Sequence, residues 1–346
     1  MQIGIDSFAA ANDDDGAAAL APSARLRNLI EEIERADRAG IDVFGVGEHH
    51  RREYLDSAPS IILAAAAART SRIRLASAVT VLSAADPVRV FQEFATLDLI
   101  SNGRAEIVAG RGSFVEAFPL FGLAFEDYDS LYAEKLDLLL ALRANTHVTW
   151  SGRHRPALHG EGVYPRPVQD PLPVWVGVGG TPASFARAGT LGLPLMVAII
   201  GGDPAQFGPL VDLYREAGRR AGHAPHTLRV GLHMIGFVAD TDAEAADTFF
   251  PGYARAFTKI GAERGWPPTT RAQFDAARGE RGALLIGDPA TVAAKIARVD
   301  AALGGIVRLQ FQMTVAALPH EKMLRAIDLL GREVAPRVRA REAGSA

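Results

Sequence analysis

Residues 72–112, RIRLASAVTVLSAADPVRVFQEFATLDLISNGRAEIVAGRG, contain one complete strand–helix–strand unit. The first strand of this unit is expected over Arg72–Leu82 and the second over Ala105–Gly110. Between them, Asp86 followed by Pro87 is typical of a helix N-terminus, and the SNG at 101–103 is expected to end that helix. Strands that alternate with helices predict βα units and a parallel sheet.

The same alternation runs along nearly the whole chain. Six further strands are expected over Ile3–Phe8, Val43–Gly47, Pro173–Val178, Pro194–Ile200, Leu228–Ala239 and Ile306–Val315. Helices are expected near 26–39, 58–70, 131–143, 182–191, 206–221, 241–262, 288–303 and 320–334. Eight strands with intervening helices predict an α/β fold, a (β/α)8 TIM barrel, with an open doubly wound sheet as the alternative.

We find no internal repeat and no linker, so a single domain is expected over residues 1–346. Two insertions interrupt the expected barrel, residues 111–172 after strand four and residues 240–287 after strand seven. Long connections in a compact barrel usually serve as lids or binding walls.

The composition excludes several classes of protein. A net charge of −3 provides no basic field for nucleic acid or for an anionic membrane. The chain has no cysteine, which excludes disulfides, thiolate metal sites and cysteine nucleophiles. The start, MQIGIDSFAAANDDDG, does not have the pattern of a secretory signal, and the apolar run at 61–68 is too short to cross a bilayer. We therefore expect a cytoplasmic protein.

Polar or glycine-rich motifs follow five of the expected strands. They are GEHHRRE at 47–53, SAVT at 77–80, AGRGS at 109–113, GVGGT at 177–181 and IIGGD at 199–203. In a βα barrel the reacting groups lie at the C-terminal ends of the strands. The five motifs are therefore expected to meet at one rim and to form the functional site there.

The pair His49 and His50 does not favour a metal site. Side chains of successive strand residues point to opposite faces, so the two imidazoles would diverge. Metal-dependent barrel hydrolases carry an HxH pair on the first strand, which here reads QIGIDSF. No metal site is predicted. A purely structural alternative is that one histidine caps backbone groups and the other lies at the surface.

The GVGGT and AGRGS motifs favour a phosphate site. Small residues at a helix N-terminus let an anion approach backbone N–H groups, and the guanidinium of Arg111 suits bidentate contact with a phosphate. GVGGT is not a dinucleotide fingerprint, because Pro182 stands where the third glycine should be. A tight strand-to-helix turn and a salt bridge of Arg111 on the barrel rim are the structural alternatives.

Four stretches together resemble the bacterial luciferase-like flavin monooxygenases. They are VFGVGEHH at 43–50, the stretch from SAVT to GRG at 77–112, PVWVGVGG at 173–180 and GLPLMVAII at 192–200. The resemblance extends in order over residues 1–240 and is weaker beyond. It implies a (β/α)8 barrel that binds a flavin at its C-terminal mouth, with the phosphate outward. It also implies reduced FMN and O2, or a deazaflavin, as reactants, and a homodimer.

The resemblance assigns roles to particular residues. His49 would be the catalytic acid/base near the reactive edge of the flavin, and Glu48 would orient neighbouring groups or hydrogen-bond the ring. Arg111 would hold the phosphate with help from the GVGGT motif, and the ring would lie on Ala78 and Val79, often at a non-proline cis peptide. The cofactor-binding residues implied are Ala78, Val79, Arg111, Val178, Gly179, Gly180, Thr181 and Ala198.

Two departures from the family pattern matter. Some relatives have a second phosphate-binding arginine after strand four, where this chain reads FEDYDSLYAEK, so Tyr128 or Ser130 would substitute for it. The light emitters of the family have a cysteine beside the flavin at the position of Gly110, so light emission is not expected.

The sequence thus predicts an FMN-dependent oxidoreductase, a monooxygenase that uses reduced flavin and O2 on a small organic substrate. A separate NAD(P)H-dependent reductase would supply the reduced FMN, because the chain has no nicotinamide fingerprint. The alternatives are a deazaflavin-dependent dehydrogenase or reductase, and a flavin-binding subunit without turnover. Phe257, Trp266 and Phe274 are candidate walls of the substrate pocket, or they only pack the insertion onto the barrel. Helix 58–70 and the helix with Phe91 and Phe94 are candidate dimer surfaces, although burial against their own barrel explains the same pattern.

Overall fold

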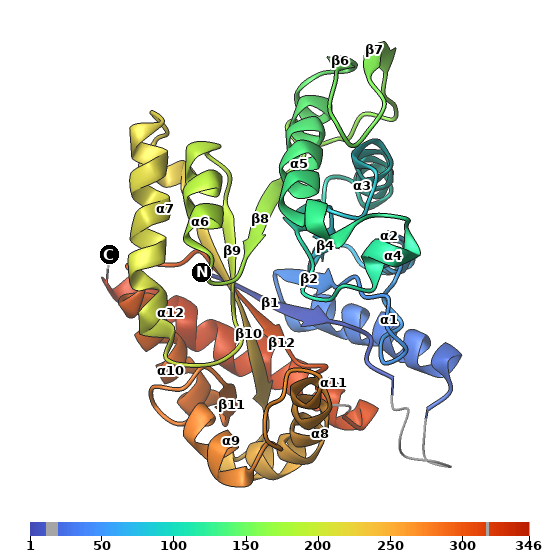
Figure 1. Ribbon diagram of the computed structural model, residues 1–346. Coiled ribbons are helices and arrows are strands. Elements are labelled where there is room, and N and C mark those ends of the chain that lie inside the picture. Colours follow the sequence, from blue (N-terminus) through green and yellow to red (C-terminus); the bar gives the residue numbers. More distant parts are fainter. Residues whose placement is uncertain (12–19, 316–317, 346) are drawn as a thin grey trace.

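The computed structural model describes residues 1–11, 20–315 and 318–345, and it contains a closed barrel of parallel strands (Figure 1). β10 pairs with both β9 and β12, which closes the ring, so the (β/α)8 prediction is confirmed and the open sheet is wrong. In spatial order the eight strands are β1 (Gln2–Ser7), β2 (Val43–Val46), β3 (Arg74–Ser77), β5 (Ala105–Gly110), β8 (Val174–Val178), β9 (Leu195–Ile199), β10 (Val230–Val238) and β12 (Arg308–Gln312).

Helices cover the outside of this barrel (Figure 1). A continuous set of buried apolar side chains, Phe91 and Phe94 among them, lies between helices and strands. The helices that follow the strands are α1 (Pro22–Ala39), α2 (Pro59–Ala67), α3 (Pro87–Ser101), α5 (Tyr128–Ala144), α6 (Pro182–Thr190), α7 (Gly208–Arg220), α8 (Asp242–Ala262) and α10 (Pro289–Ala302). α11 (His320–Leu329) continues through the π-helical turn η5 (Leu330–Val334) into α12 (Ala335–Ser345).

The strand–helix–strand unit at 72–112 has the expected helix ends. The carboxylate of Asp86 accepts hydrogen bonds from the backbone N–H groups of Val88 and Arg89, and Pro87 occupies the first turn of α3. Asn102, with φ of 54°, ends the helix in the left-handed conformation. The strand expected over 72–82 is divided into β3 and β4 (Thr80–Val81), and a cis peptide bond joins Ala78 and Val79 between them.

Both insertions contain secondary structure that the sequence analysis did not predict. Residues 111–172 include the short α4 (Ala117–Leu120) and an antiparallel hairpin, β6 (His147–Trp150) and β7 (Leu158–Gly162). Residues 240–287 include α9 (Arg271–Arg278) and β11 (Leu285–Gly287). Figure 1 shows the hairpin beyond α5, far from α8 and α9. The hairpin therefore lies apart from the part of the second insertion that packs beside β10.

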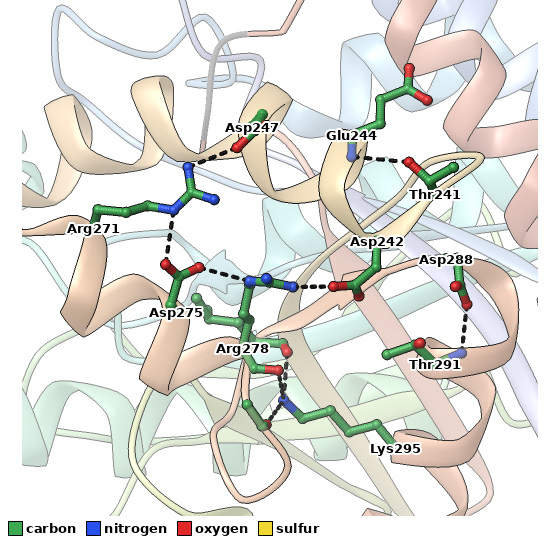
Figure 2. A network of polar contacts seen from close by, with 12 residues as sticks. Thr241, Asp242, Glu244, Asp247, Arg271, Asp275, Arg278, Asp288, Thr291 and Lys295 are labelled. Atoms are coloured by element: carbon green, nitrogen blue, oxygen red, sulfur yellow. Dashed lines mark hydrogen bonds and ion pairs between the residues drawn. The ribbon is translucent and has the colours of Figure 1, made fainter.

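An ionic network anchors α9 to its neighbours (Figure 2). Arg278 donates to Asp242 of α8 at 2.7 Å and to Asp275 at 2.9 Å. The ammonium group of Lys295 on α10 donates to the backbone carbonyls at the end of α9, and burial lowers its pKa to about 8. α9 is therefore attached to the two helices beside it, and the end of the insertion has a fixed position on the barrel.

The interior of the barrel is filled in layers because alternate residues of each strand point inward. At the N-terminal ends of the strands, Glu106 of β5 accepts from the guanidinium groups of Arg308 (β12) and Arg74 (β3). Above this ionic layer lies a small apolar cluster made of Val43, Ala76, Val108, Trp175 and Met196. These two layers close the barrel at one end, so a cavity can open only at the C-terminal ends of the strands.

Two members of the ionic layer, Glu106 and Arg308, are almost fully buried, whereas the side chain of Arg74 is 26% exposed. Glu106 is 3% exposed and Arg308 is 1% exposed, and their atoms Oε2 and Nη1 lie 2.5 Å apart. Arg308 also donates to Gln2 at 2.9 Å and stacks on the ring of Trp175. Burial by itself would raise the pKa of Glu106, but the two arginines hold it below its usual value. The carboxylate therefore pairs the buried Arg308 and the partly exposed Arg74.

We predict that Glu106→Gln destabilises the fold by about 3–5 kcal/mol, because the substitution leaves Arg308 buried without its counter-charge. Because the folded-state pKa of Glu106 is lowered, its contribution is present above the ordinary glutamate pKa and is lost only as the pH falls through that lowered value. The difference between variant and wild type should therefore be the same at pH 6 and at pH 8 in urea unfolding. Glu126→Gln, at an exposed position, is the control. Equal stability of both variants would contradict this role.

Candidate active site

A cavity of about 730 Å³ opens at the C-terminal ends of the strands. Each of the five strand-end motifs contributes to its lining. In chain order, one lining residue from each motif is His49, Ala78, Arg111, Gly179 and Gly201. The volume lies in the range of sites for cofactors and small molecules. The convergence that the sequence predicted is therefore present in the structure.

The structure brings together nine of the ten site residues singled out from the sequence. Those that line the cavity are Glu48, His49, Ala78, Val79, Arg111, Val178, Gly179, Thr181 and Ala198. The tenth, Gly180, is exposed and lies between two lining residues of the same turn, without being part of the lining itself.

One side of the cavity is a face of small residues at the ends of β3, β5, β8 and β9. Val79 lies against the backbone of Gly110 and Gly177, where an added Cβ would come within 3 Å of its side chain. With Ala78 and Ala198, these residues leave the barrel hollow where larger side chains would fill it. A face of this kind has room for a flat ring system.

Polar groups lie at the outer end of the same side. Arg111 pairs with the exposed Asp129 at 2.6 Å, and its guanidinium lies 5.1 Å from the ring centre of Tyr128. Thr181 is the N-cap residue of α6, yet its side chain makes no capping hydrogen bond. A Cβ added at Gly179 or Gly180 would meet only open space. A cation and a helix N-terminus with an uncommitted hydroxyl thus border one end of the cavity, which suits an anion.

Of the two substitutes considered for a second arginine, only Tyr128 reaches the cavity. Its hydroxyl donates to the carbonyl of Gly112 at 2.7 Å. Ser130 instead bonds to the carbonyl of Asp127 and to His154, away from the lining.

A buried carboxylate that the sequence analysis missed positions His49. Asp56 accepts from Nδ1 of His49 at 2.8 Å and from its backbone N–H at 3.1 Å. Burial raises the pKa of Asp56, and the bond to His49 opposes that shift. Two contacts to one carboxylate fix the ring, and they leave Nε2 as the imidazole nitrogen available to the cavity.

Glu48 and His50 form a separate pair. Oε2 of Glu48 accepts from the backbone N–H of Val81 at 2.8 Å, and Oε1 lies 3.2 Å from Nε2 of His50. Glu48 thus connects the end of β2 to β4. His49 and His50 have different partners, and in the described part of the chain no group of three His, Asp or Glu is arranged to hold a metal ion.

The loop after β2 is connected to the far side of the mouth through Arg51. Its guanidinium pairs with Glu53, with Glu116 before α4 and with Glu263 after α8. It also lies 4.7 Å from the ring centre of Phe114, which lines the cavity. This network brings both insertions to the rim beside His49.

The other side of the cavity comes from β1, β10, β12 and the α8 segment. At its floor, Asp6 lies 2.5 Å from Nδ1 of His233 and 2.5 Å from Nε2 of Gln310. The sequence analysis missed this cluster, although a carboxylate at Asp6, within the expected strand Ile3–Phe8, was a signal for it. Phe257 and Trp266 line this side as expected.

Phe274 was named from the sequence as a third candidate wall, but it does not line the cavity. It is fully buried and packs on Phe250 and Tyr253 instead. It therefore packs α9 on α8, a packing role of the kind that was the structural alternative.

No helix in the described ranges is long and apolar enough to cross a membrane.

Comparison with known proteins gives the family. Residues 1–305 match the sequence model of the luciferase-like monooxygenases. The chain is 29% identical to 4-hydroxyprotoasukamycin monooxygenase of Streptomyces nodosus subsp. asukaensis, over 91% of this chain and 88% of that protein. It is also 29% identical to an F420-dependent glucose-6-phosphate dehydrogenase of Amycolatopsis mediterranei, over 48% of this chain and 51% of the relative.

Some matches are partial: the alignment with the uncharacterised protein y4vJ of Sinorhizobium fredii, 29% identical, spans 63% of this chain and 62% of that protein. Solved structures match over nearly the whole chain. The monooxygenase RslO1 of Streptomyces bottropensis has a TM-score of 0.82 and 26% identity, over 97% of this chain and 99% of the other. The oxygenating constituent of 3,6-diketocamphane monooxygenase of Pseudomonas putida, solved with FMN, has a TM-score of 0.79 and 20% identity, over 98% of each chain.

The match of the family model, the closed barrel and the cavity at its C-terminal mouth agree with one another. The chain belongs to the luciferase-like monooxygenase family, whose members include flavin-dependent monooxygenases and F420-dependent oxidoreductases.

Proposed function

We propose that the protein is a monooxygenase that uses reduced FMN and O2 on a small organic substrate. The observation that carries the proposal is one cavity with an anion-binding end at Arg111 and Thr181 and a carboxylate-positioned histidine, His49. The relatives named as monooxygenases support this choice. Reduced FMN, when bound, supplies the electrons that activate O2.

The small-residue side of the cavity would hold the ring. Ala78, Val79, Val178 and Ala198 offer apolar contact, and Gly110 leaves room for Val79 to lie close to the β5 backbone. Any larger side chain at these positions would occupy the space that a flat ring needs.

The anion-binding end would hold the phosphate. Arg111 provides charge-assisted hydrogen bonds, the Thr181 hydroxyl provides another, and Gly179 and Gly180 let an anion approach the N-terminus of α6. Asp129 is the present partner of Arg111, but its side chain is 74% exposed. When Arg111 turns to a phosphate, water can therefore solvate Asp129 in its place, with little loss of free energy.

His49 would act as the acid/base. Because Asp56 accepts the hydrogen bond from Nδ1, a neutral His49 ring carries its free electron pair on Nε2, the nitrogen that takes up or releases a proton in the cavity. Glu48 would orient this region by linking the β2 loop to the backbone of β4.

A deazaflavin-dependent dehydrogenase or reductase is the second candidate, supported by the likeness to the F420-dependent glucose-6-phosphate dehydrogenase. An anion-binding end and a flat face suit either cofactor. The hydrogen bond between His49 and Asp56 argues against the third candidate, a flavin-binding subunit without turnover. For the monooxygenase, a separate NAD(P)H-dependent reductase would supply reduced FMN.

The first prediction concerns the cofactor. FMN, followed by the change in its absorbance spectrum, should bind the wild type. Arg111→Ala should weaken FMN binding by about 1.5–3 kcal/mol, the scale of a lost hydrogen bond to a charged group. Riboflavin, which has no phosphate, should bind wild type and variant alike.

Asp129→Asn is the matched control, because it frees Arg111 and should not weaken FMN binding. Unchanged FMN affinity in Arg111→Ala would remove Arg111 from the phosphate site. Binding of F420 with no binding of FMN would favour the second candidate.

The second prediction concerns proton transfer. His49→Ala should leave FMN affinity unchanged and should lower turnover by about 10²-fold or more. Turnover is measured as substrate-dependent O2 consumption with chemically reduced FMN, over a panel of small organic substrates. Asp56→Asn should lower turnover less, because it keeps the ring in place but removes the carboxylate. His223→Gln, on the loop after α7, is the control. Full turnover in His49→Ala would exclude the acid/base role.

We also propose a homodimer. Phe91 and Phe94 are buried in their own barrel, but Ile61 of α2 is 71% exposed and Ile100 of α3 is 51% exposed. These two helices contact each other, and we propose that their exposed apolar residues pack against a second chain. Sedimentation equilibrium should give the mass of two chains, and Ile61→Glu should give the mass of one. A wild type that sediments as one chain would contradict this proposal.

A further inference from the structure

The proposed function leaves one side of the cavity without an assigned role. That side is formed by β1, β10, β12 and the α8 segment, and it adjoins the small-residue side at Ala78 and Ala198. Its upper walls are aromatic, and its floor is polar. We call the group of Asp6, His233, Gln310 and Gln312 the polar floor.

The hydrogen bonds within the polar floor fix the orientation of its side chains. A carboxylate oxygen accepts, so Asp6 requires the amide NH2 of Gln310 and the Nδ1–H of His233 to point toward it, each at 2.5 Å. The side-chain oxygen of Gln312 accepts from the backbone N–H of Val315 at 2.9 Å. None of these amides can flip without losing its partner.

The fixed orientations leave two polar atoms without a partner in the described structure. They are Oε1 of Gln310, an acceptor, and Nε2 of Gln312, a donor. Both side chains are 1% exposed, and both residues line the cavity. A buried polar atom without a partner carries a desolvation cost that a suitable ligand group can relieve.

The surrounding backbone is shaped to accommodate this cluster. A Cβ at Gly45 would collide with the carboxylate of Asp6, and one at Gly4 would come within 2.8 Å of Cγ of Gln310. The ring of Phe8 stacks on His233 with the ring centres 5.9 Å apart. The polar floor is thus held by Gly4 of β1, Gly45 of β2 and Phe8, and it is in place before a ligand enters.

We propose that the polar floor binds a neutral group of the substrate that is both a hydrogen-bond donor and an acceptor, a hydroxyl or a carboxamide. Such a group donates to Oε1 of Gln310 and accepts from Nε2 of Gln312. A carboxylate has no hydrogen to donate and meets the negative charge of Asp6, and a methyl group satisfies neither atom. The proposal rests on the proposed function, because it assigns the flavin to the small-residue side of the cavity.

The walls above the polar floor define the rest of the substrate. Tyr253, Phe257 and Trp266 line the same side, and aromatic side chains favour an apolar or aromatic body. The substrate class is therefore an apolar, ring-containing molecule with one hydroxyl or carboxamide that reaches the barrel floor.

Four probes of one shape test this class: 2-naphthol, 2-naphthamide, 2-naphthoate and 2-methylnaphthalene. Their dissociation constants are measured by isothermal titration calorimetry at pH 7, with the FMN-loaded and with the cofactor-free protein. The naphthol and the naphthamide should bind at least about tenfold more tightly than the naphthoate and the methylnaphthalene. Tighter binding of the naphthoate, equal binding of all four, or binding of none overturns the proposal.

Two variants locate the preference. Gln312→Met keeps the length of the side chain and removes the free donor, so the preference for naphthol over methylnaphthalene should fall below about threefold. Ile235→Val changes an apolar residue of the same cavity on β10 and should keep the full preference. If Gln312→Met keeps the full preference for naphthol over methylnaphthalene, the assignment to Gln312 is overturned. If that variant does not fold, the ranking of the four probes on the wild type still tests the proposal. If FMN does not bind but the cofactor-free protein still ranks the four probes as expected, the proposed function is contradicted and the role of the polar floor is not.

Discussion

The closure of the barrel is the constraint on which every part of the site depends. Because β10 pairs with both β9 and β12, residues far apart in the chain point into one enclosed space. Asp6 meets His233 and Gln310 in this way, and Glu106 meets Arg308. Without closure these buried polar groups would lose the partners that offset the free-energy cost of their burial.

The barrel is packed at one end and hollow at the other. The ionic layer around Glu106 and the apolar cluster around Trp175 fill its lower part. Near the upper end, glycine and alanine take the inward positions of several strands, and the space they leave is the cavity. The same small residues let Val79 and Asp6 occupy positions that a larger neighbour would block. Stability and function are thus assigned to opposite ends of the same strands.

The two histidines of the cavity are positioned by the same device. Asp56 accepts from Nδ1 of His49, and Asp6 accepts from Nδ1 of His233. In each case a buried carboxylate fixes the ring and leaves Nε2 for another partner. His49 lies beside the loop network of Arg51 at the mouth, whereas His233 lies at the floor. We therefore propose that His49 transfers protons at the mouth of the cavity, and that the cluster around His233 recognises the substrate at its floor.

The sequence by itself determined the eight strands, the helix ends such as Asp86 and Pro87, and the set of strand-end motifs, because strand alternation and capping are local properties of the chain. Through motifs that follow strands, it singled out ten site residues, and nine of these line the cavity. Only the tertiary structure decided the partners: Asp56 for His49, the cluster of Asp6 with His233 and Gln310, and the burial of Phe274 away from the cavity. These contacts join residues that are up to 304 positions apart in the sequence. No local sequence pattern encodes which inward-pointing side chains of a closed barrel lie in the same layer.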